Sequence, residues 1–414
     1  MTQQNLQTLK GFRDFLPEEK KVRDFVASKL IQTFKLFGFE PLETPTLEYA
    51  SLLLNKYGQE ADKLVYKFED RGGREVALKY DQTVPTARVL AQYQNDLPKF
   101  FRRYQIQNVF RADKPQKGRF REFTQCDIDV FGSTGIIGIA DAEILACTYF
   151  ALKNIGINNL IIKLNDRQLL LQTLQNFASD EVNVYSIIQS IDKLDKISPA
   201  EVIEELKRKG LTQEKAEQIL QALVNVQISG QLQNIINLAQ NLGVKEDSLQ
   251  FVPSLARGLD YYTGMIFEII IPEYTAGSIG GGGRYDNLIN QLSGVDIPAV
   301  GMAFGFDRLV EVVKQFNLFT QKENQTVLMT IFTEDLKVAT LKLAAELRQK
   351  GINIEVYPAI DNLSKQFKCA SKKGIKNVLV MGQDEVEQNK ITVKNMETGQ
   401  QQTLTMKEIV NYLA

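Results

Sequence analysis

Apolar and polar side chains alternate in one short segment after another between residues 64 and 132. Turn-forming residues separate four such segments, whose sequences are LVYKFED, EVALKY, KFFRRYQIQNVFRA and EFTQCDIDVFG. A period of two is typical of strands that are buried on one face, and few helical stretches intervene. This part of the chain therefore predicts a mostly antiparallel sheet, in which every second side chain lies on the same face.

Helical sequence flanks and interrupts this sheet. Residues 18–37 carry apolar side chains at helical spacing and end at Gly38, whereas residues 166–250 indicate one helix after another. Strand-like and glycine-rich sequence then resumes as far as residue 320. We expect one α+β domain over residues 1–320, interrupted by a helical insertion at 166–250.

A polar link at residues 321–325 precedes a different pattern. Apolar strand-like segments then alternate with helical ones at about 334–350 and 363–373, which is typical of parallel βαβ units. A hairpin around the turn METGQ and a last helix follow. Residues 326–414 therefore predict a small second domain of the α/β class.

Composition restricts the chemistry more than it restricts the fold. The chain has 49 Lys and Arg against 50 Asp and Glu, so a polyanion must meet a local basic patch. It has no histidine, which excludes Ser-His-Asp and Cys-His nucleophiles, His-ligated zinc and an imidazole base. Its three cysteines lie far apart, which favours a reducing cytoplasm. No apolar stretch is long enough to predict a membrane span or a secretion signal.

The densest basic stretch covers residues 99–123. Eight cations lie there against two anions, and their guanidinium groups suit phosphate or carboxylate oxygens. The cations are Lys99, Arg102, Arg103, Arg111, Lys114, Lys117, Arg119 and Arg121. The stretch predicts a phosphate site, and the alternative is a solvated hairpin with surface cations.

Carboxylates follow this basic stretch at alternate positions. Gln125, Asp127 and Asp129 share one face of a predicted strand, as Asp81 and Thr83 do in LKYDQT. Carboxylates that face a cleft lined by arginine side chains can accept hydrogen bonds from an ammonium or an N–H group. The alternative is ordinary salt bridging within the sheet.

Two glycine-bearing segments come later in the chain. RGLDYYTG at 257–264 reads as strand, where adjacent tyrosines point to opposite faces, so we expect only one of them to line a pocket. Four glycines precede Arg284 and allow a ligand to approach the backbone closely, or form a tight turn. They match neither the P-loop nor the dinucleotide motif. Arg308 begins a helix, where it faces a phosphate or joins an ion pair around Asp307.

Taken together, these segments resemble the class II aminoacyl-tRNA synthetases, and among them the histidyl-tRNA synthetase family. Motif 1 resembles GFEPLETPTLE at 38–48, motif 2 the stretch 110–132, and motif 3 GMAFGFDRL at 301–309. RGLDYYTG and, more loosely, GGGRYD resemble the signatures specific to histidine. The chain departs from the family at Lys79, where arginine is usual, and at Asp81, where many bacterial members have glutamate.

The resemblance implies that ATP, with Mg²⁺, activates L-histidine to histidyl-adenylate, and that histidine then passes to the 3′ end of tRNA(His). Arg111 and Arg257 would approach the α-phosphate, and Arg119 and Arg308 the outer phosphates. The nucleophile is a carboxylate, already ionised at neutral pH, so no general base is needed. We expect no metal ligands from the protein itself.

For the amino acid, the resemblance implies two groups of residues. Asp129 and Tyr262 would bond the two imidazole nitrogens, with Tyr261 nearby. The ammonium and carboxylate groups would be held by Asp81, Thr83 and Gln125.

The resemblance also implies a homodimer with motif 1 at its interface and a C-terminal domain that reads the anticodon. Pro41 and Pro45 in an extended segment predict an edge or interface strand. One alternative is the regulatory subunit of ATP phosphoribosyltransferase, a relative that lacks the tail domain and tends to lose catalytic arginines. Another is a class II synthetase for proline, threonine or glycine, which RGLDYYTG disfavours.

Overall fold

The computed structural model describes residues 6–54, 63–115, 119–132, 138–256, 261–320 and 326–413. The chain forms two compact units, residues 1–319 and 320–414, and each is described by itself.

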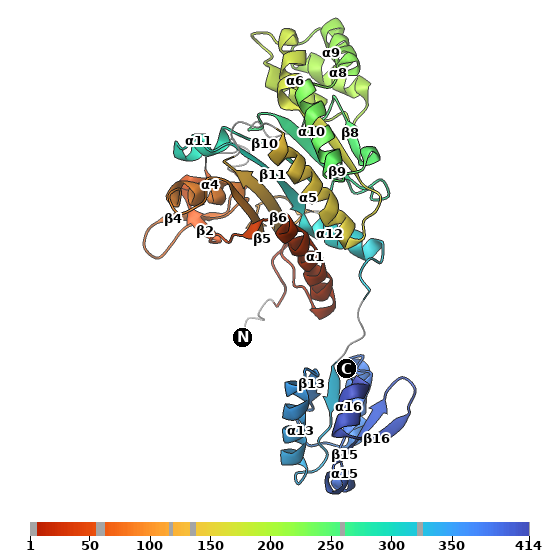
Figure 1. Ribbon diagram of the computed structural model, residues 1–414. Coiled ribbons are helices and arrows are strands. Elements are labelled where there is room, and N and C mark those ends of the chain that lie inside the picture. Colours follow the sequence, from red (N-terminus) through yellow and green to blue (C-terminus); the bar gives the residue numbers. More distant parts are fainter. Residues whose placement is uncertain are drawn as a thin grey trace. The chain divides into compact units, whose positions relative to one another are not determined.

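An eight-stranded sheet forms the centre of the first unit (Figure 1). Its neighbouring strands are antiparallel, except that the outer pairs β1–β5 and β7–β8 are parallel. In spatial order the strands are β1 (Glu40–Pro41), β5 (Phe101–Phe110), β6 (Glu122–Phe131), β11 (Ala299–Gly305), β10 (Gly280–Arg284), β9 (Met265–Ile270), β7 (Ile161–Asp166) and β8 (Leu249–Phe251). The predicted antiparallel sheet is confirmed, and the segment with Pro41 forms its edge strand.

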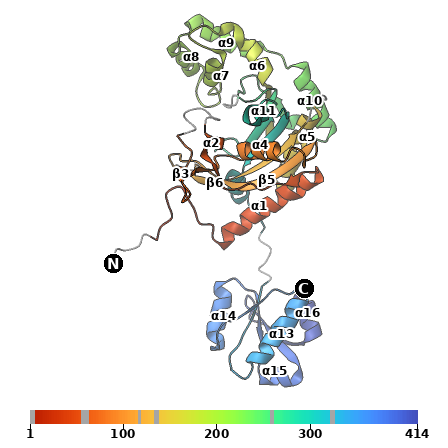
Figure 2. The same cartoon turned by 90° about the vertical axis from the view of Figure 1, so that its left-hand side faces the viewer.

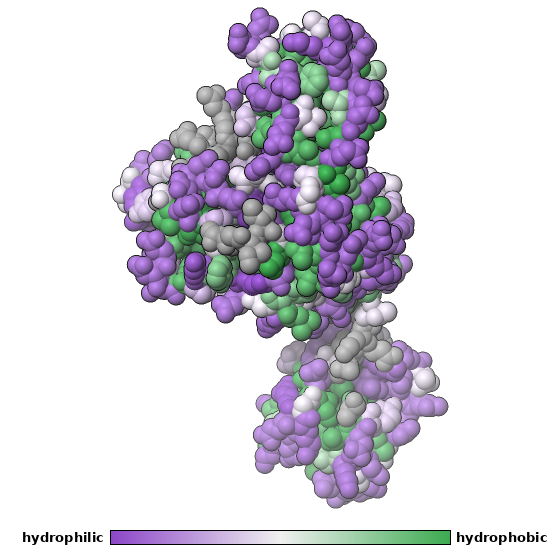
Figure 3. All heavy atoms as spheres, turned by 45° about the horizontal axis from the view of Figure 1, so that its top comes forward, coloured by the Kyte–Doolittle hydropathy of each residue, from purple (hydrophilic) through white to green (hydrophobic). Residues whose placement is uncertain are grey.

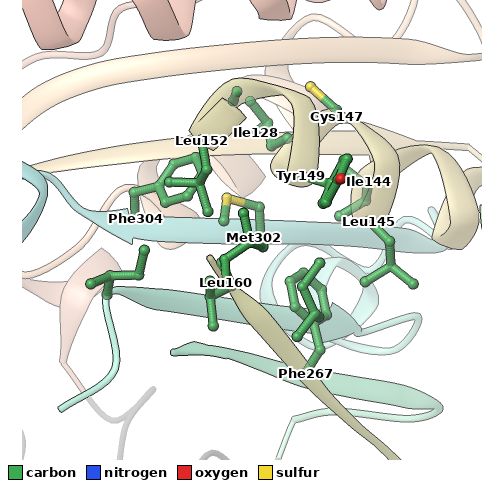
Figure 4. Packing of buried hydrophobic residues seen from close by; sticks show 14 of the residues in the cluster. Ile128, Ile144, Leu145, Cys147, Tyr149, Leu152, Leu160, Phe267, Met302 and Phe304 are labelled. Carbon is green, nitrogen blue, oxygen red and sulfur yellow. The ribbon is translucent and has the colours of Figure 1, made fainter. Parts of the chain in front are cut away.

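Helices cover one face of this sheet, which we call the apolar face (Figures 1 and 2). They are α1 (Pro17–Leu36), α5 (Ile139–Ile155), α10 (Gly230–Asn241) and α12 (Phe306–Gln315). Figure 4 shows Leu152 of α5 lying beside Phe304 of β11. The helix predicted at 18–37 is confirmed, and Gly38 follows it with a positive φ of 72°. Burial of these side chains is the main stabilising term for this unit.

The stretch predicted as an insertion contains helices with two different packing partners. Most of them surround a hydrophobic cluster of their own. These are α6 (Arg167–Leu174), the 3₁₀ helix η1 (Gln175–Phe177), α7 (Val184–Ile191), α8 (Pro199–Arg208) and α9 (Gln213–Asn225). By contrast, α10 packs on α5 within the main cluster. Ser198 and Thr212 cap α8 and α9, and each side chain accepts a hydrogen bond from a backbone N–H of the first helical turn.

Smaller elements lie over the opposite face, which we call the polar face. A three-stranded sheet in the order β2–β4–β3 precedes α4, and α11 follows β10. Their bounds, with two short elements of the same unit, are β2 (Leu47–Tyr49), α2 (Ala50–Leu53), β3 (Lys67–Glu69), β4 (Glu75–Leu78), α4 (Thr83–Gln92), α11 (Leu288–Ser293) and the 3₁₀ helix η2 (Glu246–Ser248).

The second unit has its own five-stranded sheet and hydrophobic cluster. Three strands are parallel and the last two form the predicted hairpin, so the βαβ prediction is confirmed. The strands in spatial order are β13 (Ile354–Val356), β12 (Val327–Met329), β14 (Asn377–Val380), β15 (Lys390–Asn395) and β16 (Gln401–Thr405). The helices are α13 (Lys337–Gln349), α14 (Leu363–Lys372), α15 (Gln383–Gln388) and α16 (Met406–Leu413).

Hydrophilic side chains dominate the surface shown in Figure 3, with smaller hydrophobic patches between them. Across the described ranges, no helix combines the length and the apolar character that crossing a membrane requires.

Candidate active site

The polar face carries charged side chains where β5 and β6 pair. Arg103 lies opposite Asp129, and Gln105 lies opposite Asp127. All four side chains are buried. Alternation places them on one face, while the residues between them join the main hydrophobic cluster on the other. Buried charges are costly unless they are paired, so their concentration here indicates a functional site.

Asp129 is held by two residues from other strands or loops. Nη2 of Arg103 lies 2.7 Å from Oδ2 of Asp129, and the hydroxyl of Tyr285 donates to Oδ1. Burial raises the pKa of Asp129, while Arg103 and the Tyr285 hydroxyl lower it. Burial also raises the pKa of Tyr285 well above its ordinary value, so this phenol is a donor at neutral pH.

Glycines make room for Asp129 on the neighbouring strand. Gly301 of β11 is its register partner, and a Cβ there would lie 1.8 Å from Oδ1 of Asp129. Gly283 of β10 pairs with Gly301, and a Cβ on Gly283 would lie 2.9 Å from Cδ1 of Tyr262. The four consecutive glycines thus form a central strand, and the alternative that they form a turn is wrong. Their close packing lets Asp129 and Tyr262 lie against bare backbone.

The two adjacent tyrosines do not point to opposite faces. Their ring centroids are 4.7 Å apart, and that of Tyr261 is 5.8 Å from that of Tyr285. Both precede β9 and lie outside any strand, so strand alternation does not apply to them. The strand predicted for this segment was therefore wrong at Tyr261 and Tyr262, and the expectation that only one of them lines a pocket stays a prediction. Tyr285 was not predicted as a site residue, although its place in GGGRYD was a signal.

The N-terminus of α4 borders the same face. Asp81 is 9% exposed, and its Oδ1 accepts a hydrogen bond from the backbone N–H of Val84 at 3.2 Å. Thr83, the first residue of α4, is half-buried. Nε2 of Gln82 donates to the backbone oxygen of Gln125 at 2.8 Å, which ties the helix to β6. Among the described residues, Oε1 of Gln82 and Oε1 of Gln125 are buried without a hydrogen-bond partner.

Two of the predicted arginines lie at the end of the sheet where β6 begins and β11 ends. Nε of Arg111 donates to the backbone oxygen of Tyr80 at 3.1 Å, and its guanidinium lies 4.3 Å from the centroid of that ring. Arg308 donates through Nη1 to the backbone oxygen of Ser278, and its side chain passes Gly305 on the polar face. A guanidinium fixed in this way suits phosphate oxygens.

Arg119 and Arg257 are the other two cations that were predicted at the site. Nη2 of Arg119 donates to Oδ1 of Asp113 at 2.8 Å, and its side chain is 54% exposed. Arg257 lies outside the described residues. Near Arg308, Asp307 pairs with Arg13 and Arg23 at 2.9 and 2.5 Å.

Buried Lys79 occupies the side of the site next to β1. Its Nζ donates to Oε1 of Gln107 at 2.8 Å and to the backbone oxygen of Thr44 at 3.2 Å. Burial lowers the pKa of Lys79 to about 8, against the raising effect of Glu43 and Glu48. This lysine therefore joins the segment of motif 1 to β5 instead of standing free in the site.

Arg284 belongs to the opposite face. It donates from Nε to Oδ1 of Asp141 on α5 at 3.0 Å and from Nη1 to Oδ1 of Asp286 at 2.9 Å. Arg284 is the last residue of the glycine strand β10, and its ion pair with Asp141 joins the sheet to α5.

The two ends of the site along β6 carry different kinds of side chain. Two arginines lie at the end near Gln125, and an acid with three phenols lies at the end near Asp129. Four residues of strand separate the two ends, about 13 Å. This arrangement of side chains suits a ligand with a phosphate at one end and a group with N–H donors at the other.

Comparison with known proteins adds independent observations. The chain matches the family model described as Histidyl-tRNA synthetase over residues 11–309 and that described as Anticodon binding domain over residues 322–414. A protein from Cytophaga hutchinsonii named Histidine–tRNA ligase is 36% identical over 448 residues, and 98% of each chain is covered.

Solved structures give the same picture. The crystal structure of histidyl-tRNA synthetase from Nostoc sp. PCC 7120 has a TM-score of 0.84 at 30% identity, over 99% of both chains. A structure from Bacillus halodurans C described as an ATP phosphoribosyltransferase regulatory subunit/histidyl-tRNA synthetase has a TM-score of 0.71 at 21% identity. It covers 89% of this chain and 96% of its own, and shows likeness of fold alone.

Proposed function

The chain belongs to the histidyl-tRNA synthetase family, and we propose which of its residues carry out the reaction of that family. Its members are class II aminoacyl-tRNA synthetases, and the function of the chain is accordingly histidine–tRNA ligation. ATP activates histidine to histidyl-adenylate with release of pyrophosphate, and histidine then passes to the 3′-terminal adenosine of tRNA(His). The synthetase-like regulatory subunit is the less supported alternative.

Asp129 and Tyr262 bind the imidazole ring of histidine at the end of the site where Asp129 lies, with Tyr261 beside them. Arg103 and the Tyr285 hydroxyl orient the carboxylate of Asp129, which keeps further lone pairs for a ring N–H. A side chain without that N–H would leave buried polar groups unpaired, which is the stronger kind of discrimination between substrates.

The polar end of histidine lies toward the start of β6. Asp81 and Thr83 at the N-terminus of α4 hold the ammonium, together with Gln125. The buried Oε1 atom of Gln125 that lacks a partner among the described residues supports this role, because an ammonium would satisfy it.

Arg111 and Arg308 bind the phosphates of ATP, Arg111 at the α-phosphate and Arg308 at the outer phosphates. Arg119 assists at the outer phosphates, and Arg257, outside the described residues, is proposed for the α-phosphate. An oxygen of the histidine carboxylate bonds to the α-phosphorus while the bond to the β-phosphate breaks, and pyrophosphate takes that electron pair. Fixed cations stabilise the charge that accumulates at phosphorus.

Mg²⁺ accompanies ATP in this class of enzyme. In the part of the chain that the structure describes, no group of three or more Cys, Asp or Glu side chains is arranged to hold a metal ion. Mg²⁺ commonly keeps several waters and binds through one or two carboxylates plus substrate phosphates, so this donor set fits an ion held chiefly by ATP. When bound, the ion neutralises phosphate charge.

The observation that carries the assignment is the buried pair of Arg103 and Asp129 beside Gly301, at the far end of the face from Arg111. A pyrophosphate exchange assay tests it: labelled pyrophosphate should enter ATP only when histidine is present. A regulatory subunit would exchange nothing, and a synthetase of another specificity would respond to proline, threonine or glycine instead.

The chain also forms a homodimer and binds tRNA(His) through its second unit, by the same proposal. Tyr49 of β2 and Phe68 of β3 flank Val76 of β4 in one row, and are 60% and 49% exposed. Exposed aromatic side chains in such a row suit an interface between copies. Sedimentation velocity should give a dimer, and Tyr49→Glu with Phe68→Glu should shift it toward monomer.

A further inference from the structure

We propose that Asp127 is a second carboxylate for the α-ammonium group of histidine, beside Asp81. This inference rests on the proposed function and adds a residue to it, because Asp127 has no role in the binding scheme above.

The position of Asp127 is the first reason. It lies on the polar face of β6 between Gln125 and Asp129, two residues or about 7 Å from each. Its register partners are Gln105 on β5 and Ala303 on β11. The α-amino group of histidine likewise lies between its carboxylate and its ring, so Asp127 faces the middle of the bound amino acid.

The hydrogen bonding of Asp127 is the second reason. Its side chain is buried, with 4% of the residue exposed. Its Oδ1 has no hydrogen-bond partner among the described residues. Its Oδ2 lies 3.9 Å from Nη2 of Arg103, which is beyond hydrogen-bond distance. A buried carboxylate oxygen that lacks a partner is rare unless a ligand supplies one.

The local charge balance is the third reason. Arg103 faces two carboxylates, and the closer one is Asp129 at 2.7 Å. Lys79 and Arg111 also interact electrostatically with Asp127, but each donates a hydrogen bond to a neighbouring backbone oxygen. Asp81 adds a further negative charge. Among the described residues no cation lies within hydrogen-bond distance of Asp127, and the histidine ammonium would supply one.

The protonation state of Asp127 agrees with this geometry. Burial raises the pKa of Asp127 to about 8, Arg103 lowers it, and Asp129 and Asp81 raise it. Without substrate the carboxyl therefore carries a proton at neutral pH. When the ammonium binds, the O–H proton of Asp127 leaves to solvent and the carboxylate pairs with the ammonium. Net, one proton is released for each histidine bound.

Asp127→Asn, which keeps the shape and removes the charge, tests the proposal by calorimetry with two ligands. L-Histidine carries the ammonium, and 3-(imidazol-4-yl)propionate lacks it. The variant should weaken histidine binding about tenfold to a hundredfold, the range for hydrogen bonds to charged groups. It should change binding of the analogue less than about twofold, because nothing on that ligand meets Asp127. Asp24→Asn on the exposed surface of α1 is the matched control and should change neither.

Proton release gives a second readout. Calorimetry at pH 7 in buffers of different ionisation enthalpy should show that the wild type releases about one proton more on binding histidine than Asp127→Asn does. Equal weakening of both ligands, or no weakening of either, overturns the proposal, as does equal proton release. A wild type that binds neither ligand would instead contradict the proposed function.

Discussion

The two faces of the eight-stranded sheet use the same strands for opposite purposes. On the apolar face Ile128 and Met302 pack under α5, where burial stabilises the fold. On the polar face the adjacent positions hold two buried acids, Asp127 and Asp129. Gly301 lies there too, and its backbone is in close contact with Asp129 because it has no side chain. Burying charge costs stability unless a partner is supplied, so we attribute the charged residues of the polar face to substrate binding and catalysis and not to stability. Mutations on the two faces should therefore have different signatures.

The largest expected effect is on catalysis, at the end of the polar face where Arg111 and Arg308 lie. Arg111→Ala should lower the rate of histidine-dependent pyrophosphate exchange by about 10² to 10³, as loss of a preorganised charge donor does. The melting temperature should change little. Arg74→Ala, in an exposed ion pair with Asp70, is the control and should leave the rate unchanged. Equal rates for the two variants would remove Arg111 from the mechanism.

A pair of neighbouring substitutions separates the two faces directly. Gly301→Ala places a Cβ against Asp129 and should raise the KM for histidine about tenfold to a hundredfold, by disturbing a charged hydrogen bond. Met302→Ala on the apolar face should lower the free energy of unfolding by about 2 to 5 kcal/mol. Its KM for histidine should remain that of the wild type. Steady-state kinetics measures the KM, and urea unfolding measures the free energy of unfolding. If the two variants changed both quantities alike, the proposed difference between the faces would be wrong.

The pH dependence of stability should show the cost of burying a carboxylate on the polar face. Folding raises the pKa of Asp127 from 3.8 to about 8, so the folded state holds an extra proton between these values. The free energy of unfolding should fall as pH rises through this window, by at most about 1.4 kcal/mol per unit. Asp127→Asn should remove this contribution, so its stability relative to wild type should increase from pH 5 to pH 8. Urea titrations at four pH values measure it, and a constant difference would contradict it.

The smallest effect is expected far from both faces. Ser198 caps α8, and its hydroxyl accepts from the backbone N–H of Glu201 while that carboxylate returns to the backbone N–H of Ser198. Ser198→Ala should lower the free energy of unfolding by about 1 kcal/mol. The KM for histidine should not change. A change in KM would mean that the helical cluster around α8 acts on the site.

Local patterns predicted much of the fold. The helix at 18–37 and the strands β5 and β6 were predicted because each depends on neighbours within a few residues. Predictions failed where local context misled: the glycines at 280–283 form a strand because β9 and β11 pair with them from both sides. The strand predicted for RGLDYYTG was also wrong at its tyrosines, since β9 begins only at Met265.

By itself the sequence determined which side chains share a face, because alternation along a strand is a property of the backbone. It therefore placed Gln125, Asp127 and Asp129 together. Only the tertiary structure decided what meets them: the hydroxyl of Tyr285 reaches Asp129 from 156 positions away, and Gly301 lies beside it. Strand order follows from burial and backbone pairing over the whole domain, and no local pattern encodes those long-range contacts.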